Sequence, residues 1–459
     1  MVPAAVGTGP VSRGAQLQAV AVPAPTPRWP WIGAKSGLGR TGRPALRGGR
    51  RPAKQVRRCD MQGIATMAAH RAIVLWLACT AGLLAPSARA QLHETLVTSQ
   101  KYLIDPEFSQ SRAKIAWVDS GGRLWIAGVD RSTGMFVPAT GKGRLVDPDA
   151  MKTSDFDMLG NGPEWIGTSA GDQLVYTKFL PGLPHQARNA RLALAQQSPG
   201  GGWSYGYIDP GHTRSTPYAS SDAGDPSPRI SYVDPFGNHY WRNLYDASSE
   251  TLVQQFPPSR LSPMSFVKNT RAAAFAAPVD GVSQVFVYWL DENRAEQITF
   301  DDGQKDLHSR PWIWQAPEYG GALVLATVVD DTRLRLYALP PGGSQADWTV
   351  ITNIHTPQAG LINSPEIFIH NGRSYIFFTA SMPPAPYLST IFLTGIDDTQ
   401  PMPQQLTPDE PLRVRGDPEV FVADDGPYIY YNRMTVNAEG DAYGNEGIYR
   451  AYTGLPPAQ

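Results

Sequence analysis

The feature that most constrains the fold is a motif that returns about every fifty residues. In each copy a small or acidic residue precedes a proline, often followed by Glu and an apolar residue, just before a predicted pair of strands. The copies are Asp105-Pro106-Glu107-Phe108, Gly162-Pro163-Glu164-Trp165, Ser227-Pro228-Arg229-Ile230, Ser262-Pro263-Met264, Ala316-Pro317-Glu318-Tyr319, Ser364-Pro365-Glu366-Ile367 and Asp417-Pro418-Glu419-Val420. The intervals between the prolines are 57, 65, 35, 54, 48 and 53 residues. Four-stranded propeller blades repeat at this period, whereas a β-sandwich has no such long repeat, so the motif predicts a β-propeller. Seven blades fit best, and the uneven intervals leave six or eight open.

The residues between the motifs predict an all-β chain. Short runs rich in Val, Ile, Tyr, Phe and Trp, such as 113–119, 322–330 and 374–380, are bounded by turn residues such as Asn371-Gly372. Such runs are typical of strands joined by hairpins. A proline suits the first residue of an inner strand, where the missing N–H needs no ladder partner.

The last repeat offers three strands and lacks a fourth. The segment 92–103, ahead of the first motif, has strand-like residues. We expect it to supply the outer strand of the last blade, because this clasp removes the open edges of the sheets.

The first ninety residues are expected to lie outside the fold. Residues 1–60 hold eleven Lys or Arg and one acid. Residues 1–66 are therefore either a basic disordered tail that contacts nucleic acid or upstream sequence ahead of a true start at Met61 or Met67. Residues 67–90 have a basic start, a thirteen-residue apolar run over 72–84 and an Ala-Arg-Ala cleavage site, which together predict a signal peptide. The predicted propeller domain is 91–459.

Export changes the charge and cysteine content. Subtracting the thirteen basic residues and one acid before Gln91 from totals of 40 and 41 leaves 27 and 40, a net charge of −13. An acidic surface argues against nucleic acid and anionic membranes as partners. Both cysteines, Cys59 and Cys79, are removed with the signal, so a disulfide is not expected. We predict a periplasmic or secreted monomer that does not insert into a membrane and that binds a protein or a glycan.

Asp105-Pro106-Glu107-Phe108-Ser109 followed by KIAWVD resembles the blade start of periplasmic TolB-like (WD40-like) propellers, which open with Ser-Pro-x-Phe and continue into a polar turn and an aliphatic strand. Residues 363–380 and 416–432 are also similar to blades of the five-bladed family 43 glycoside hydrolases. That second resemblance implies an Asp base, a Glu acid and an orienting Asp near the channel. Here Asn363 stands at the position of the acid, and Asp417 matches an Asp-Pro position of the family.

The carboxylates of the repeat are the first candidate site. If each starts an inner strand, they ring one end of the channel, where they raise one another's pKa or bind a cation such as calcium. The alternative is structural, with each carboxylate joining blades by hydrogen bonds to backbone N–H groups or to Arg. The ring would contain Asp105, Glu107, Glu164, Glu318, Glu366, Asp417 and Glu419. We select Glu164, Glu318, Glu366 and Asp417 as ligand-binding residues.

The second candidate is the segment 180–225, which the sequence predicts to be the longest loop. Its aromatic and imidazole side chains would stack on a sugar or a peptide, or else form a cap without a ligand. They are Trp203, Tyr205, Tyr207, His212 and Tyr218, of which all but Tyr218 are selected as ligand-binding residues. Residues 437–446 alternate oxygen ligands like a calcium loop but lack its Gly and final Glu, so a polar hairpin loop is expected. We expect no resident metal or cofactor.

Three functions remain, of which a mainly structural envelope protein is the weakest. The first is a binding or scaffold propeller that recognises a protein or glycan through the channel mouth and loops. The alternative is a carbohydrate-active enzyme, a glycoside hydrolase or lyase, using Asp105, Glu366 and Asp417. The binding function is favoured, because no complete catalytic set is found.

Overall fold

The computed structural model describes residues 92–459 except 102, 152–161, 170, 185, 221–226, 255–263, 267–271, 302–307, 358–359, 383–387, 398–401 and 438–441. Within these residues the protein consists of β-strands and short 3₁₀ helices, without an α-helix. No helix in this part of the chain is long and apolar enough to cross a membrane. The predicted upstream segment 1–66 and signal peptide 67–90 lie outside the described residues.

The strands form antiparallel sheets that follow the order of the chain. The first sheet contains β2 (Ile104–Ser109), β3 (Lys114–Val118), β4 (Leu124–Val129), β5 (Phe136–Val137) and β6 (Arg144–Asp147). The second contains β7 (Glu164–Ile166), β8 (Gln173–Phe179), β9 (Ala190–Gln197) and β10 (Trp203–Tyr207). The third contains β11 (Ser215–Ala219), β12 (Arg229–Val233), β13 (His239–Asn243) and β14 (Thr251–Gln254).

The later sheets continue the pattern. The fourth contains β15 (Ser265–Phe266), β16 (Ala272–Val279), β17 (Val282–Trp289) and β18 (Arg294–Gln297). The fifth contains β19 (His308–Ala316), β20 (Ala322–Val329), β21 (Arg333–Leu339) and β22 (Thr349–His355). An eight-stranded sheet contains β23 (Leu361–His370), β24 (Arg373–Met382), β25 (Leu388–Gly395), β26 (Gln404–Gln405), β27 (Arg413–Ala423), β28 (Gly426–Val436), β29 (Ala442–Tyr452) and β1 (Glu94–Thr98). Its two halves are joined by a single parallel pair, Leu388 with Arg413.

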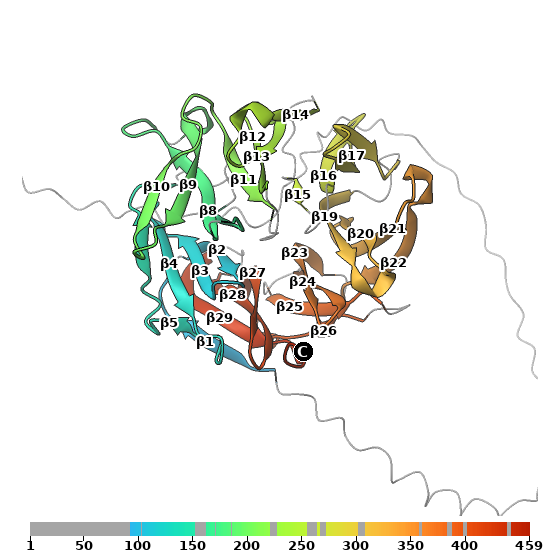
Figure 1. Cartoon of the computed structure of the whole chain (residues 1–459). Helices are drawn as coiled ribbons and strands as arrows, with labels where there is room; N and C mark the ends of the chain where they lie inside the picture. The colour runs from blue at the N-terminus through green and yellow to red at the C-terminus, as the bar shows by residue number, and fades with distance from the viewer. Residues whose placement is uncertain are drawn as a thin grey trace, which may run out of the picture.

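The sheets are arranged in a ring, with the first strand of each near the centre (Figure 1). We call β2, β7, β11, β15, β19, β23 and β27 the inner strands. This arrangement is a β-propeller, so the predicted all-β propeller class is confirmed. The blade number of seven stays a prediction.

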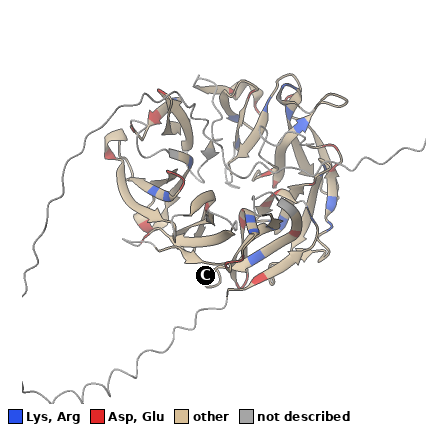
Figure 2. Cartoon of the chain, turned by 180° about the vertical axis from the view of Figure 1, so that it is seen from behind, with Lys and Arg blue, Asp and Glu red and all other residues tan. Residues whose placement is uncertain are grey.

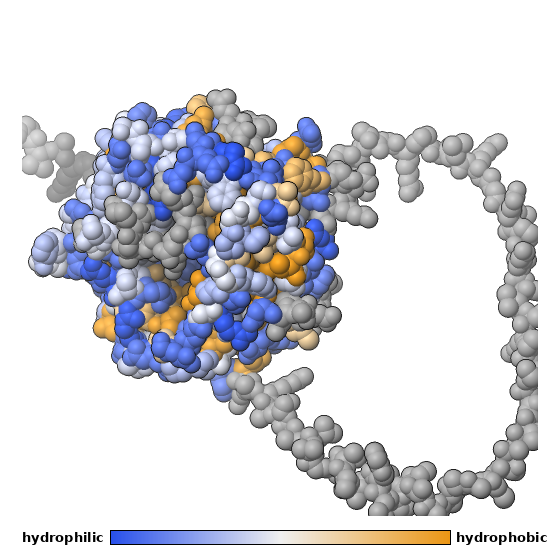
Figure 3. Space-filling view, turned by 45° about the vertical axis from the view of Figure 1, so that its right-hand side comes forward, coloured by the Kyte–Doolittle hydropathy of each residue, from blue (hydrophilic) through white to orange (hydrophobic). Residues whose placement is uncertain are grey.

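Packing between blades explains the sequence of the middle strands. Each sheet buries both faces against its neighbours, so these strands read as continuous apolar runs rather than alternating ones. All seven residues of β8 are buried, for example. One apolar cluster joins Ala116 and Leu124 of the first sheet to Trp165 and Leu174 of the second. Charged residues lie mainly on turns and strand ends (Figure 2), and the face in Figure 3 is mostly hydrophilic with small apolar patches.

The predicted clasp is confirmed. Strand β1 pairs antiparallel with β29, so the N-terminal segment supplies the outer strand of the last blade. Glu94 of β1 accepts hydrogen bonds from Arg415 at 2.6 and 2.8 Å, from Tyr431 at 2.7 Å and from Arg433 at 3.0 Å. The Arg415 side chain is fully buried and that of Glu94 is 4% exposed, so a buried ion pair holds the ring closed.

In two blades the predicted motif proline is not the proline of the inner strand. The third inner strand, β11, contains Thr216-Pro217, whereas Ser227-Pro228 precedes the second strand of that sheet. The fifth inner strand, β19, contains Arg310-Pro311, and Ala316-Pro317 follows at its far end in the 3₁₀ helix η3 (Pro317–Tyr319). With prolines 106, 163, 217, 263, 311, 365 and 418 the intervals are 57, 54, 46, 48, 54 and 53 residues, closer to a regular repeat.

The predicted long loop over 180–225 is also wrong. Most of this segment forms β9, β10 and the inner strand β11. Gly, Ser and Pro make it resemble a loop, but its alternating Tyr and Trp residues belong to an outer strand. The calcium-like segment 437–446 lies partly outside the described residues, and β29 begins within it at Ala442.

Candidate functional site at the channel

Inner strands carry a β-bulge at the residue before proline. The pairing register shifts at this point in β2, β11, β19, β23 and β27. The residues before proline there have positive φ angles: 50° at Asp105, 55° at Thr216, 48° at Arg310, 43° at Ser364 and 57° at Asp417. A non-glycine residue in this region is strained by about 1–3 kcal/mol, and such strain concentrates at functional sites. A bulge also redirects the neighbouring side chains.

Two of these bulges place carboxyl groups in direct contact. Asp105 of β2 and Asp417 of β27 share a side-chain hydrogen bond. Two carboxyl groups can share a hydrogen bond only if one of them keeps its proton. Asp105 also accepts a hydrogen bond from the backbone N–H of Gly162, which precedes β7. The pair therefore sits where three inner strands meet.

A second carboxyl pair lies beside the first. Glu366 of β23 and Glu419 of β27 share a side-chain hydrogen bond. Glu419 is 8% exposed, and Glu366 is partly exposed. The charges of Asp105 and Asp417 act on both glutamates. Two proton-sharing pairs thus lie within electrostatic reach of each other.

Glu107, Glu164 and Tyr218 complete the cluster. The charges of Glu164 and Glu366 act on Glu107. Tyr218 comes from β11 and is reached by Glu164 of β7 and by Glu366 of β23. These electrostatic interactions link side chains from β2, β7, β11, β23 and β27, which are all inner strands, so the side chains lie near one another at the channel. We call the six acids and Tyr218 the channel cluster: Asp105, Glu107, Glu164, Tyr218, Glu366, Asp417 and Glu419.

Burial and mutual repulsion favour the protonated acids. Burial, the largest cause, raises the pKa of Asp105 to about 6. Burial and the neighbouring carboxylates raise the pKa of four more acids well above the ordinary range: Glu107, Glu366, Asp417 and Glu419. Burial and the same charges raise the pKa of Tyr218. Burial is the largest cause for each acid, and the neighbouring charges that raise these pKa values further belong to other acids, so the cluster retains protons at pH values at which ordinary carboxyl groups are ionised.

Clustered acids that hold protons can take part in proton transfer or receive a cation. In the described part of the chain, no group of three or more His, Cys, Asp or Glu side chains is arranged to hold a metal ion. Arg310 occupies the bulge of β19, but its guanidinium donates to the carbonyl oxygen of Ile362 at 2.6 Å. The charge that acts on Arg310 is that of Asp331. Most members of the cluster keep a partly exposed surface through which a ligand could reach them.

The structure brings together six of the seven repeat carboxylates but not Glu318. Glu318 lies in η3, at the far end of β19, because the motif proline of this inner strand is Pro311 and not Pro317. Its carboxylate accepts hydrogen bonds from the backbone N–H and the hydroxyl of Ser374 in the next blade, at 2.8 and 3.0 Å. The prediction that Glu318 belongs to the carboxylate ring is wrong. Its hydrogen bonds join two blades, which is the structural role given above as the alternative.

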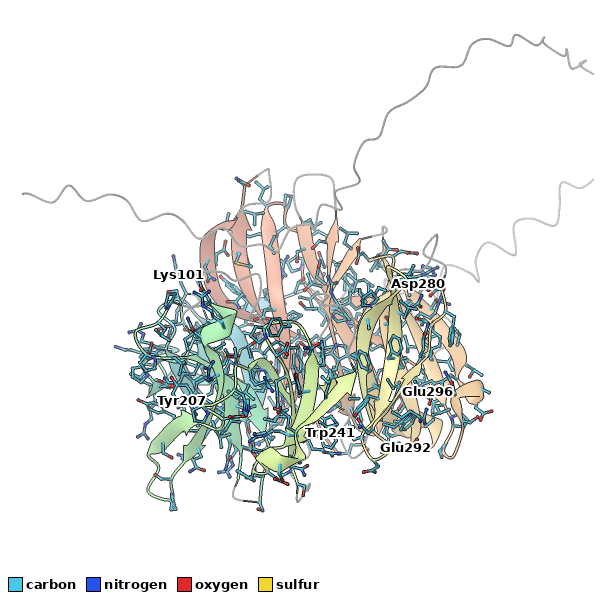
Figure 4. All side chains as sticks on the ribbon, turned by 90° about the horizontal axis from the view of Figure 1, so that it is seen from above. Lys101, Tyr207, Trp241, Asp280, Glu292 and Glu296 are labelled. Carbon is cyan, nitrogen blue, oxygen red and sulfur yellow. The ribbon has the colours of Figure 1, made fainter. Side chains whose placement is uncertain are left out.

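Four of the predicted ligand-binding residues lie on or after the outer strand β10 and do not belong to the channel cluster. Tyr207 lies at the outer side of its blade (Figure 4) and donates to the carbonyl oxygen of Phe179. Trp203 packs edge-on against Trp165, and His212 contacts the carboxylate of Asp209. Tyr205 is exposed, as is His212. Tyr218 was not among the predicted ligand-binding residues, although it is the one aromatic residue of this segment in the channel cluster. The Thr216-Pro217 sequence directly before it, which marks the inner strand β11, could have identified it.

The comparisons with known proteins concern the fold. No family model matches the chain, and no curated protein matches it. It is similar to TolB from Acinetobacter baumannii, with 12% identity, a TM-score of 0.37 and coverage of 73% of this chain and 78% of that one. The Cps50 (Swd1) β-propeller domain of Myceliophteria thermophila gives 7% identity, a TM-score of 0.48 and coverage of 78% and 98%. A subtype N11 neuraminidase-like protein from a flat-faced bat isolate gives 9% identity, a TM-score of 0.41 and coverage of 78% of this chain and 97% of that one.

These neighbours include the TolB propeller that the motif resembles. The class of protein itself follows from the ring of four-stranded sheets and the N-terminal clasp described above. The chain is a β-propeller with an acidic cluster at its channel.

Proposed function

We propose that this protein is an exported β-propeller that binds a protein partner at its channel, and that the partner inserts a cationic side chain into the channel cluster. The observation that carries the proposal is the set of two proton-sharing carboxyl pairs, Asp105 with Asp417 and Glu366 with Glu419. Export is proposed on the signal-peptide pattern of residues 67–90.

The electrostatics of the cluster favour a cationic guest. Without one, the acids keep protons because ionisation is opposed by burial and by their neighbours. A positive charge placed among them favours the ionised forms, so binding releases protons. Affinity should therefore rise with pH through the range in which the acids titrate.

An arginine side chain fits this site better than a lysine. The planar guanidinium presents five donors and binds carboxylates in pairs, whereas an ammonium is a compact charge with a tightly held hydration shell. Tyr218 offers an aromatic ring and a hydroxyl in the same cluster. A partner loop that inserts one arginine would use both carboxyl pairs.

The test is calorimetry with a short arginine-containing peptide and the same peptide with neutral citrulline in place of arginine. We expect saturable binding of the arginine peptide, at least tenfold weaker binding of the citrulline peptide, and proton release measured by repeating the titration in buffers of different ionisation enthalpy. Glu366→Gln should weaken binding, and the control Glu318→Gln, which removes an acid outside the cluster, should not. Equal binding of both peptides, or no binding, would refute the proposal.

A second candidate is carbohydrate chemistry, which the Asp105–Asp417 pair favours because it sets a proton donor beside an acceptor. A hydrogen-bonded pair is closer than the roughly 5 Å that separates the carboxyls of retaining glycosidases. The acid and base would therefore have to come from different pairs, for example Asp105 or Asp417 with Glu366. Release of reducing ends from an oligosaccharide panel, lost in Asp105→Asn, Glu366→Gln and Asp417→Asn, would support this candidate over the first.

A further inference from the structure

A cavity of about 390 Å³ lies between the first and second blades, at their outer strands. Its wall combines residues of β3 to β6 with Gln197 of β9 and Trp203 of β10. The volume falls within the roughly 300–1,000 Å³ typical of small-molecule sites. It involves none of the residues of the channel cluster.

The cavity exists because the outer edge of the first blade is interrupted. Strands β5 and β6 both pair with β4, and the chain between them leaves the sheet at Pro138 and returns at Gly143. A side chain at Gly143 would drive its Cβ into the backbone oxygen of Ile126, so only glycine fits there. The loop is anchored at the other side, where the Thr98 hydroxyl donates to the carbonyl oxygen of Thr140 at 3.2 Å. The hollow is thus built into the fold.

The charged side chains that line the cavity are all basic: Lys114, Lys142 and Arg144. Arg144 donates to the carbonyl oxygen of Gly201 at 2.5 Å and Lys114 to the side-chain oxygen of Gln197 at 2.7 Å. Both cations therefore bond to neutral oxygens at the cavity wall. Burial is the largest cause that lowers the pKa of Lys114; the charge of Arg112 lowers it further, and the charge of Asp172 raises it.

Trp203 gives the cavity an aromatic wall. The Lys114 ammonium lies 5.6 Å from the centre of its ring, and Trp165 holds the ring edge-on at 6.3 Å. The indole nitrogen of Trp203 is shielded from solvent and has no acceptor among the described residues. Val137 and Pro138 supply apolar surface on the other side.

We infer that this cavity binds an anionic sugar residue, such as a uronic acid unit of a polysaccharide. Its carboxylate would lie between Lys114 and Arg144, with Lys142 nearby. Its apolar ring face would lie against Trp203 or against Val137 and Pro138, since amphipathic aromatic rings suit ligands with one apolar and one polar side. A cluster of cations is unusual on a chain whose predicted mature net charge is −13, and it selects for an anion against that background.

The test uses trigalacturonate and, as its neutral counterpart, galactotriose, titrated into the full protein by calorimetry at low salt. We expect saturable binding of trigalacturonate, binding at least tenfold weaker for galactotriose, and a further loss of affinity in 0.5 M salt. Lys142→Gln combined with Arg144→Gln should reduce trigalacturonate binding at least tenfold without unfolding, because both side chains are exposed.

Three further variants test whether trigalacturonate binds at this cavity. Lys101→Gln removes an exposed cation, labelled in Figure 4, that is not among the residues lining the cavity, and should leave binding unchanged. Glu366→Gln should also leave trigalacturonate binding unchanged, although it should weaken binding of the arginine peptide. The two proposals can therefore fail independently. Trp203→Phe should weaken binding while the fold is retained. Absence of saturable binding, equal affinity for galactotriose, or full binding by the double variant would overturn the inference.

Discussion

Removing one negative charge from the channel should stabilise the protein. The pKa of Asp105 is raised from 3.8 to about 6, chiefly by burial. Between these two values the folded state holds a proton that the unfolded state has released, so the free energy of unfolding falls as pH rises through this window. One pKa unit corresponds to about 1.4 kcal/mol, so the full effect above pH 6 approaches 3 kcal/mol.

Asp105→Asn removes this pH-dependent fall in the free energy of unfolding and keeps the shape of the side chain. The asparagine oxygen can still accept the hydrogen bond from the backbone N–H of Gly162. We therefore expect the variant to be more stable than the parent by up to about 3 kcal/mol at pH 7, with no difference near pH 4.

Urea unfolding at intervals from pH 4 to 8 measures the effect. The matched control is Asp119→Asn. Burial opposes ionisation of Asp119, but hydrogen bonds from Arg123 and Trp125 outweigh it and lower the pKa, so this carboxylate stabilises the fold when ionised. The control should lose stability at pH 7, opposite in sign to Asp105→Asn. A loss of stability in Asp105→Asn at pH 7, or a gain that does not change with pH, would refute the reasoning.

Three further predictions concern the clasp, the blade junction and the start of the mature chain. Glu94→Gln should lower the free energy of unfolding by about 3 kcal/mol, the lower end of the range for breaking a buried ion pair, since the buried Arg415 guanidinium loses its nearest counter-charge and keeps only the longer contact with Glu410 at 3.7 Å; chemical denaturation measures this, and a loss under 1 kcal/mol contradicts it. Glu318→Gln should cost about 1–3 kcal/mol by weakening the contact with Ser374, without changing binding at the channel. N-terminal sequencing of protein from the native host should begin at Gln91, and a stable product that retains Met1 would contradict export.

The fold was predictable because two periodicities in the sequence reflect its physics. Apolar runs mark strands buried on both faces, and a proline motif about every fifty residues marks the inner strand of each blade. The clasp was predictable because the last repeat lacks a strand. The two misplaced units share a cause: Ser227-Pro228 and Ala316-Pro317 look more like the motif than Thr216-Pro217 and Arg310-Pro311 do, although only the latter carry the bulge.

The candidate site was predictable only in part. Asp105, Glu366 and Asp417 were identified because they belong to copies of the motif that fall on inner strands. The pairing of Glu366 with Glu419 joins residues of different blades. It depends on how the blades are arranged around the channel, which no local sequence pattern predicts. Trp203 was identified as an aromatic ligand-binding candidate, but its partners Lys114 and Arg144 come from the neighbouring blade and carry no motif.

The central claim is that the channel cluster retains protons until a cation displaces them. The direct measurement is a carboxyl ¹³C NMR titration of protein labelled at Asp and Glu, with Asp105→Asn and Glu366→Gln to assign the signals. The account predicts carboxyl groups that are still wholly or, for Asp105, partly protonated at pH 6, that are missing from these variants, and that become ionised when the arginine peptide is added at that pH. If every carboxyl group has lost its proton by pH 5, or the peptide leaves the protonated signals in place, the account is contradicted.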